Sequence, residues 1–356
     1  MESCQSADVG CWRKIVELGN GRTGSVTLCI EPESPGDEKS PGEHRHRVFH
    51  AVKKVNKQRV TNNGAIRRVL QEKKALQAVG GQHGIVELRC TSKDDVNLYF
   101  VLEPLLGGPL HRHIRAGSNG HLEVSAANFY ASEITSAIAH MHTHGFVHRD
   151  VKASNIVLGS TGHAKLVDLG CSKQLETKGR ENIVNMGARC GVDCEKTYTY
   201  CGTPHCMAPE MISREGHGYA VDWWALGILI HEMLTGEPPF GYGGGDELLQ
   251  RIVAGLPEVD SRNDGVAAAS DETKRFIPIT RHLLSTEPQQ RLGSLRDADE
   301  VMSHEWFEAV DWARTGTRDQ DPPEFRRDLG ELEYLEEQMG KGAAADVDID
   351  GLFAGF

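Results

Sequence analysis

The sequence lacks the features of membrane, secreted and nucleic-acid-binding proteins. None of its 356 residues lie in an apolar run near the roughly 20 residues that span a bilayer. The start lacks a basic-then-apolar secretory signal, and Glu2 stands where N-myristoylation requires glycine. With 39 basic and 51 acidic residues, the formal net charge is −12, which disfavours nucleic acid and anionic lipid as partners. We therefore expect a cytoplasmic protein, with nuclear entry left open.

The nine cysteines form no dense framework, which favours reduced thiols inside a cell. Cys190 and Cys194 are spaced as C-x3-C, and Cys201, His205 and Cys206 follow shortly after, so a zinc site has to be considered. Zinc pairs more often lie two residues apart, and Cys201 and Cys206 belong to a different motif, described below. We favour free thiols over a metal centre.

Apolar periodicity divides the chain into a strand-rich half and a helical half. Alternation at residues 15–18 and 26–30, around glycines, predicts a hairpin, and residues 31–47 predict a solvated loop. Further strands are expected at 48–55, 85–90 and 98–102, with a helix around 66–79. Beyond a hinge at 103–108, residues 129–141 predict an amphipathic helix and 221–234 a buried one.

The hairpin contains a glycine pattern suited to binding phosphate. Residues 19–26 fit G-x-G-x-x-G-x-V, in which missing side chains let backbone N–H groups approach phosphate oxygens. A dinucleotide-binding turn would be followed by a helix, whereas here a second strand follows Gly24. Lys53, on the next strand, could reach the phosphates if Glu72 on the following helix holds it. Taken singly, Lys53 and Glu72 would be interpreted as surface charges, which is the usual state of such residues.

The strongest signal is the run His148-Arg149-Asp150-Val151-Lys152-Ala153-Ser154-Asn155, followed by Asp168-Leu169-Gly170. Phosphoryl transfer needs a carboxylate that accepts the hydroxyl proton, an amide and a carboxylate for Mg²⁺, and a cation near the γ-phosphate. Asp150, Asn155, Asp168 and Lys152 supply these groups in order. Each could also be a capping or solvated loop residue, but coincidence of all four spacings is improbable.

With these motifs the chain resembles the eukaryotic protein kinases. Ala208-Pro209-Glu210 would close the activation segment, with Arg291 as the ion-pair partner of Glu210. The resemblance is closest to the AGC group, especially the cyclic-AMP-dependent kinase catalytic subunit and then the cyclic-GMP-dependent kinase. It rests on the segments TYCGTP (199–204), GYAVDWWALGILIHEMLTGEPPF (218–240) and HEWFEAVDW (304–312), and it covers about residues 12–312.

This resemblance implies an α+β fold of two lobes that transfers the γ-phosphoryl group of ATP, with Mg²⁺, to serine or threonine hydroxyls of protein substrates. The implied divisions are an extension at 1–11, a small lobe of antiparallel strands and one main helix at 12–105, a mainly helical large lobe at 106–311 and a tail at 312–356. The implied catalytic residues are Asp150, Lys152, Lys53, Glu72 and Thr203, with Asn155 and Asp168 as metal ligands. The implied ATP-binding residues are Leu18, Gly19, Asn20, Gly21, Arg22, Thr23, Gly24, Val26, Ala51, Lys53, Leu102, Glu103, Leu105, Val157 and Asp168.

The resemblance also implies regulation. Thr199 occupies the activation-loop phosphorylation position, and Arg68, Arg149 and Lys173 match its basic partners. Phe353 and Phe356 match the F-x-x-F tail that AGC kinases fold onto the small lobe. An upstream activating kinase and a regulatory subunit are the implied partners, beside the protein substrates.

The chain departs from its relatives in three places. Leu169 replaces a phenylalanine after the metal ligand, which should preserve activity. Residues 175–196 form an insertion in the activation segment, which we interpret as disordered rather than as a redox or docking element. Pro109 and Ser154 replace two acidic residues that read substrate arginines, while Glu232 keeps the third, so a basic consensus is only partly supported. The alternative function is a nucleotide-binding pseudokinase scaffold, which the presence of Lys53, Asp150 and Asp168 disfavours.

Overall fold

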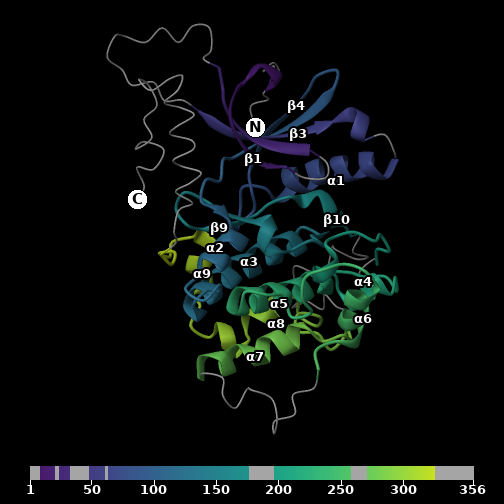
Figure 1. The fold of residues 1–356 in the computed structure, drawn as a ribbon, viewed down its shortest axis with the longest axis vertical. Coiled ribbons are helices and arrows are strands. Elements are labelled where there is room, and N and C mark those ends of the chain that lie inside the picture. The colour runs from purple at the N-terminus through teal and green to yellow at the C-terminus, as the bar shows by residue number, and fades with distance from the viewer. Residues whose placement is uncertain are drawn as a thin grey trace, which may run out of the picture.

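The computed structural model describes residues 9–20, 24–32, 48–60, 63–175, 196–257 and 271–324. Two lobes lie one above the other, the upper one built mainly of strands and the lower one mainly of helices (Figure 1). The expected α+β fold of two lobes is confirmed. No helix in these ranges is long and apolar enough to cross a membrane.

The small lobe is a five-stranded antiparallel sheet in the order β1-β2-β3-β5-β4. Its elements are β1 (Arg13–Asn20), β2 (Gly24–Ile30), β3 (Phe49–Asn56), α1 (Asn63–Val79), β4 (Leu88–Lys93) and β5 (Asn97–Leu102). Side chains alternate between the two faces of β3. Ala51 and Val55 join the cluster that contains Leu76 of α1, whereas Val52 packs with Trp12 on the other face.

The predicted strand at 85–90 was wrong in its bounds, because β4 begins only at Leu88. The two apolar residues before it pair with the large lobe instead. Ile85 forms a bridge with Leu166, and the Val86 N–H donates to the Leu166 carbonyl at 3.1 Å. Both side chains are buried in the main core cluster, so their apolar character reflects a connection between the lobes.

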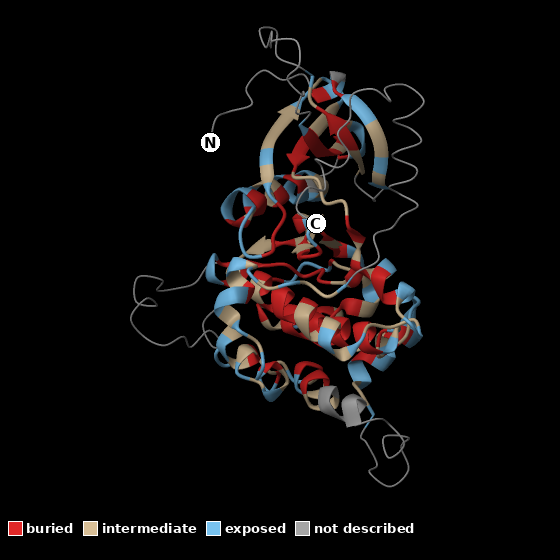
Figure 2. Ribbon diagram, turned by 90° about the vertical axis from the view of Figure 1, so that its left-hand side faces the viewer, coloured by how far each residue is buried: buried red, intermediate tan, exposed pale blue. Residues whose placement is uncertain are grey.

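The large lobe is helical around a central buried helix, α5 (Ala220–Thr235), as predicted. Trp223 and Trp224 of α5 are fully buried, and the lobe's buried residues concentrate on its inner helices (Figure 2). The other helices are α2 (Leu110–Ala116), α3 (Val124–Thr143), α4 (Pro209–Ile212), α6 (Asp246–Ala254), α7 (Asp271–Leu283), α8 (Ala298–Met302) and α9 (Trp312–Thr317).

Short strands at the top of the large lobe position the loops that face the small lobe. One sheet has the order β6-β8-β9, from β6 (Gly108–Pro109), β8 (Ile156–Leu158) and β9 (Ala164–Leu166). A second pairs β7 (Phe146–Val147) with β10 (Lys173–Gln174). Single 3-10 turns lie at η3 (Ala153–Asn155), η4 (Leu169–Cys171) and η6 (Pro204–Cys206).

Some predictions fall outside the described residues. These are most of the loop at 31–47, most of the insertion at 175–196 with Cys190 and Cys194, and the terminal Phe353 and Phe356. The predicted tail begins with α9, and Trp312 stacks edge-on against Phe307 with ring centroids 5.3 Å apart. The chain thus still packs on the large lobe at residue 312.

Candidate active site

Lys53 of β3 meets two carboxylates that come from distant parts of the sequence. Its Nζ lies 2.6 Å from Glu72 Oε1 of α1 and 2.8 Å from Asp168 Oδ1. Burial opposes the charge of Lys53, but Glu72 and Asp168 outweigh burial and hold the lysine pKa above its ordinary value. The ammonium is therefore fixed at the junction of the lobes.

The loop before Asp150 is held by Asp222, which is fully buried at the start of α5. Its two carboxylate oxygens accept the backbone N–H groups of His148 and Arg149, each at 2.7 Å. Arg149 has a φ of +68°, a conformation that costs a non-glycine residue energy. These two charge-assisted hydrogen bonds stabilise the strained turn that presents Asp150.

Asp150, Lys152 and Thr203 form a closed triangle. Asp150 Oδ1 accepts the Thr203 hydroxyl at 2.7 Å, and its Oδ2 accepts Lys152 Nζ at 2.9 Å. Lys152 Nζ also donates to Thr203 Oγ1 at 2.5 Å. A carboxylate, a cation and a hydroxyl thus converge from the loop after β7 and from the strand-like segment before η6.

Asn155 and Asp168 supply oxygen atoms beside this triangle. Asn155 Nδ2 donates to the Asp150 carbonyl at 2.9 Å and to Asp150 Oδ2 at 3.1 Å, so its amide oxygen is turned away from Asp150. The Val167 N–H donates to the Asn155 carbonyl at 2.8 Å, which brings the segment of Asp168 alongside. Half of the Asp168 side chain is exposed. One amide and one carboxylate oxygen suit a hard cation such as Mg²⁺.

The apolar residues among those expected to bind ATP lie mostly in or against the main core cluster. Ala51 and Leu102 belong to the main core cluster, and Leu18, Val26 and Leu105 are partly buried against it. Val157 of β8 is also partly buried. Glu103 Oε1 accepts Lys165 Nζ at 2.5 Å, which fixes the connection between the lobes.

The glycine motif is described only at its two ends. Gly24 could not carry a side chain, since a Cβ would lie 1.9 Å from the Lys54 carbonyl oxygen, whereas Gly19 faces open space. Residues 21–23, which include Gly21, Arg22 and Thr23, lie outside the described residues, as does the side chain of Asn20.

The structure does not bring Thr199 to its expected partners. Thr199 is exposed, and Arg149 Nη1 instead donates to Oγ1 of the buried Thr197 at 3.3 Å. Within the described ranges, neither Arg68, which is exposed, nor Lys173 hydrogen bonds to Thr199. Sequence reasoning missed Thr197, although the Thr-x-Thr spacing offers both threonines as candidates.

Glu210 and Arg291 form the ion pair that the sequence suggested. Arg291 is 1% exposed, and its Nη1 and Nη2 lie 2.6 and 2.9 Å from the two carboxylate oxygens of Glu210. The guanidinium also donates to the carbonyls of Ala220 and Ser285 and lies 5.1 Å above the Trp224 ring. This pair anchors the end of the activation segment to the large lobe.

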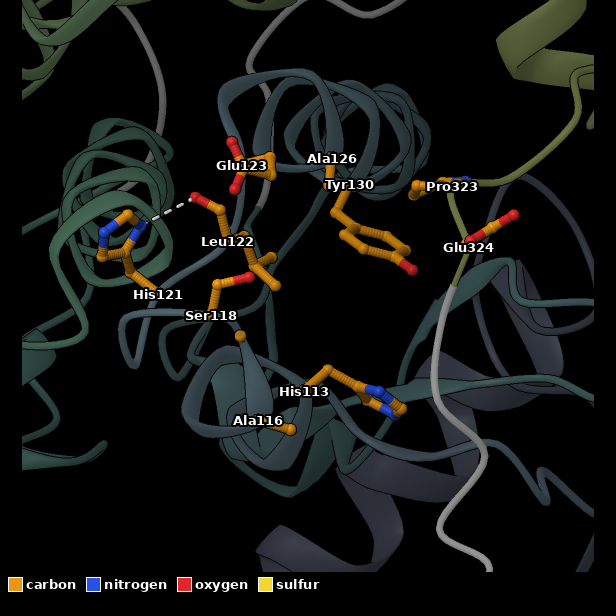
Figure 3. A pocket seen from close by; sticks show the side chains of 11 residues that line it. His113, Ala116, Ser118, His121, Leu122, Glu123, Ala126, Tyr130, Pro323 and Glu324 are labelled. Carbon is orange, nitrogen blue, oxygen red and sulfur yellow. Dashed lines mark hydrogen bonds between the residues drawn. The ribbon is translucent and has the colours of Figure 1, made fainter.

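A pocket of about 440 Å³ lies away from these residues, between α2, the start of α3 and residues 323–324 (Figure 3). None of the described residues that line it is a predicted site residue. His113 Nε2 is hydrogen bonded to the Gly107 carbonyl and His121 Nδ1 to the Leu122 carbonyl, so these groups are already occupied. We assign no function to this pocket.

The protein kinase domain family matches residues 12–307 of the chain. The chain belongs to the protein kinase family. The kinase is 34% identical over 303 residues to a cAMP-dependent protein kinase, catalytic subunit-like, of Caenorhabditis briggsae, covering 85% of this chain and 68% of the relative. It is 32% identical over 347 residues to the cAMP-dependent protein kinase catalytic subunit PRKX of Mus musculus, covering 95% and 86%. A Drosophila melanogaster protein kinase C is 32% identical over 306 residues, covering 86% and 36%.

These relatives confirm the prediction of a serine/threonine protein kinase of the AGC group. Enzymes of this family generally use ATP and Mg²⁺ and act on protein substrates. The alternative of a nucleotide-binding scaffold without activity receives no support from the comparisons.

Proposed function

We propose that this kinase binds Mg-ATP between Lys53, the glycine motif and Asp168, and transfers the γ-phosphoryl group with Asp150 as the proton acceptor. The triangle of Asp150, Lys152 and Thr203 supports this proposal most directly. A substrate hydroxyl that approaches Asp150 would find a carboxylate to take its proton and a lysine to stabilise charge on the transferred group. Thr203 would hold both side chains in position.

Asn155 and Asp168 would hold Mg²⁺, since their oxygens are of the type that this cation prefers. When bound, the metal neutralises charge on the β- and γ-phosphates. Lys53 would orient the α- and β-phosphates, and Glu72 would keep the lysine in place. The apolar side chains of Leu18, Val26, Ala51, Leu102, Leu105 and Val157 would enclose the adenine.

Asp150→Asn tests the assignment. The variant should lose transfer of radiolabel from ATP to a mixed-peptide library while its affinity for nucleotide stays close to that of the wild type. Asp95→Asn, on an exposed turn between β4 and β5, is the matched control and should keep full activity. Undiminished transfer by Asp150→Asn would show that another group accepts the proton.

Phosphorylation at Thr199, introduced by an upstream kinase, is the proposed activating modification. A phosphate there would need the loop to move, because Arg149 contacts Thr197 in the described arrangement. Thr199→Ala should lower the peptide-phosphorylation rate sharply, and Thr197→Val should lower it less. The reverse order would identify Thr197 as the activating residue.

The substrate-facing surface supports only a partial preference for arginine. Glu232 is buried, and its Oε1 accepts the Tyr242 hydroxyl at 2.8 Å, while Pro109 and Ser154 carry no charge. We propose protein substrates with a weak basic requirement, and a regulatory subunit that does not depend on all three arginine sites. We also propose a cytoplasmic location. Selection from a randomised peptide library would test the preference, and a strict arginine requirement at two positions would contradict it.

A further inference from the structure

Tyr242 joins two parts of the large lobe beside the catalytic triangle. It is 48% exposed and lies on the loop at 241–245, just before α6. Its hydroxyl donates to Glu232 Oε1 of α5 at 2.8 Å, and its ring meets the His205 ring edge-on, with centroids 5.4 Å apart. His205 belongs to η6 and follows Thr203 by two positions. Tyr242 therefore connects Glu232 to the segment that supplies Thr203 of the triangle.

Glu232 carries a buried carboxylate that has no cation of the described chain in contact. The residue is 5% exposed, and within the described ranges the Tyr242 hydroxyl is the only hydrogen-bond or ion-pair partner of the carboxylate. Burial raises the pKa of Glu232, whereas the hydrogen bond from Tyr242 and the charge of Arg115 lower it. A buried carboxylate is costly unless a cation pairs with it. Glu232 is thus suited to a lysine or arginine that another molecule supplies.

The carboxylate of Glu232 lies near the place where a substrate hydroxyl would bind. Thr203, at the start of η6, donates to Asp150 Oδ1 at 2.7 Å. Cys206, at the end of η6, belongs to the same buried cluster as Ile228, which lies one turn before Glu232 on α5. A peptide whose hydroxyl reaches Asp150 can therefore bring a side chain a few residues away to Glu232. This step rests on the proposed function, since it takes the substrate to bind beside Asp150.

The loop that carries Tyr242 has glycine at position 241 and at 243–245. Three of these glycines have a positive φ, between +77° and +137°. A Cβ at any of the four would meet no atom within 4 Å, so no close approach requires glycine there. The glycines instead give the backbone conformational freedom. The contacts with Glu232 and His205 hold Tyr242 in place, and the loop allows the side chain to swing away when a cation competes for the carboxylate.

We propose that Tyr242 is a specificity-determining residue, which covers the Glu232 carboxylate and lets the kinase accept substrates that bring no cation to this position. Burial and the neighbouring Glu232 raise the pKa of Tyr242 to about 12, so its hydroxyl remains a donor at neutral pH. A substrate lysine or arginine has to displace this hydroxyl, and its attraction to Glu232 is offset by the hydrogen bond that is lost. The weak basic requirement of the kinase thereby has a structural cause.

Binding of inert peptides to the purified full chain tests this inference without any need for phosphoryl transfer. The peptides carry alanine in place of the acceptor and a single arginine that is moved along the sequence, and fluorescence anisotropy measures their affinity. Removal of a hydrogen bond to a charged group should free Glu232, so in Tyr242→Ala an arginine at one position should improve the affinity at least about tenfold. The wild type should gain less than about threefold at that position, and Tyr242→Phe should lie between the two.

Two further variants assign the gain to the Glu232 carboxylate. Glu232→Gln combined with Tyr242→Ala should abolish the gain, because the amide offers no negative charge to the arginine. Gly244→Ala is the matched control, since it alters the same loop at a position where a Cβ meets no neighbour, and it should bind all peptides as the wild type does.

Three outcomes would overturn the inference. The first is that arginine improves binding to Tyr242→Ala at no position, and the second is that the gain survives Glu232→Gln. The third is a weaker arginine preference in Tyr242→Phe than in the wild type, which would show that Tyr242 orients Glu232 for arginine instead of covering it. Serine versions of the same peptides separate this inference from the proposed function. Absence of transfer by every variant, with the arginine gain in binding intact, would count against the proposed function alone.

Discussion

Removal of Arg291 should destabilise the large lobe more than any change at an exposed arginine. The guanidinium is 1% exposed and makes two charge-assisted bonds to Glu210, at 2.6 and 2.9 Å. It also donates to two carbonyls, at 3.0 and 3.1 Å. Arg291→Ala would leave the buried Glu210 carboxylate without its cation and two carbonyls without their donor.

Breaking one side of such a buried pair costs about 3–5 kcal/mol. A protein's total free energy of unfolding is roughly 5–15 kcal/mol, so Arg291→Ala should remove a large fraction of it. Glu210→Ala should cost a similar amount, since Arg291 then remains buried without its carboxylate. The double variant should cost less than the sum, by at least about 1 kcal/mol, because both single changes remove the same interaction.

Urea unfolding followed by tryptophan fluorescence measures these differences, and Trp224 lies 5.1 Å beneath the guanidinium. Arg296→Ala is the matched control, because its side chain is exposed five residues along the same segment, and it should change the free energy of unfolding by less than about 0.5 kcal/mol. A cost below about 1 kcal/mol for Arg291→Ala, or strictly additive single costs, would refute the reasoning.

Three further predictions concern the supports of the catalytic loop. Burial disfavours protonated His142, but Asp297 and Asp222 outweigh burial and raise the His142 pKa from 6.5 to about 9. The stability that protonated His142 contributes should therefore be complete below pH 6.5 and be lost as the pH rises towards 9. Urea titrations of the wild type and His142→Asn should converge at high pH; a constant difference would argue against this. Gly202→Ala, at a φ of +101°, should lower the free energy of unfolding by about 1–3 kcal/mol. Calorimetry would measure this loss, and an unchanged free energy of unfolding would contradict the prediction. Thr203→Val should reduce kcat on the order of tenfold with little change in the KM for ATP, whereas Thr203→Ser should stay active; equal loss in both would assign Thr203 a packing role.

Sequence periodicity predicted the fold where a segment packs within one lobe. The hairpin, the third strand and the buried helix α5 all appear, because their apolar pattern reflects a single packing surface. Prediction failed at Ile85 and Val86, whose backbone pairs with Leu166 of β9 rather than with a strand of the small lobe, while their side chains are buried in the main core cluster. Periodicity reports that a residue is buried but not which partner buries it.

The contacts of the candidate site were likewise predicted only in part. The sequence suggested that Glu72 holds Lys53, and their side chains are in contact in the structure. The contact of Lys53 with Asp168 was not predicted. Motif spacing did not indicate the hydrogen bond from Arg149 to Thr197, because the two residues lie far apart in the sequence and Thr197 belongs to no predicted motif. Contacts that form only through the path of the activation segment need the folded chain.

Phosphate transfer by the wild-type chain is the most direct test of the central claim. Purified protein would be incubated with radiolabelled ATP, Mg²⁺ and matched peptides that differ only in a serine, threonine or tyrosine acceptor. The account predicts label on the serine and threonine peptides, none on the tyrosine peptide, and none on any peptide with Asp150→Asn. Nucleotide binding by the wild type without label on any peptide would contradict the account and identify the chain as a scaffold.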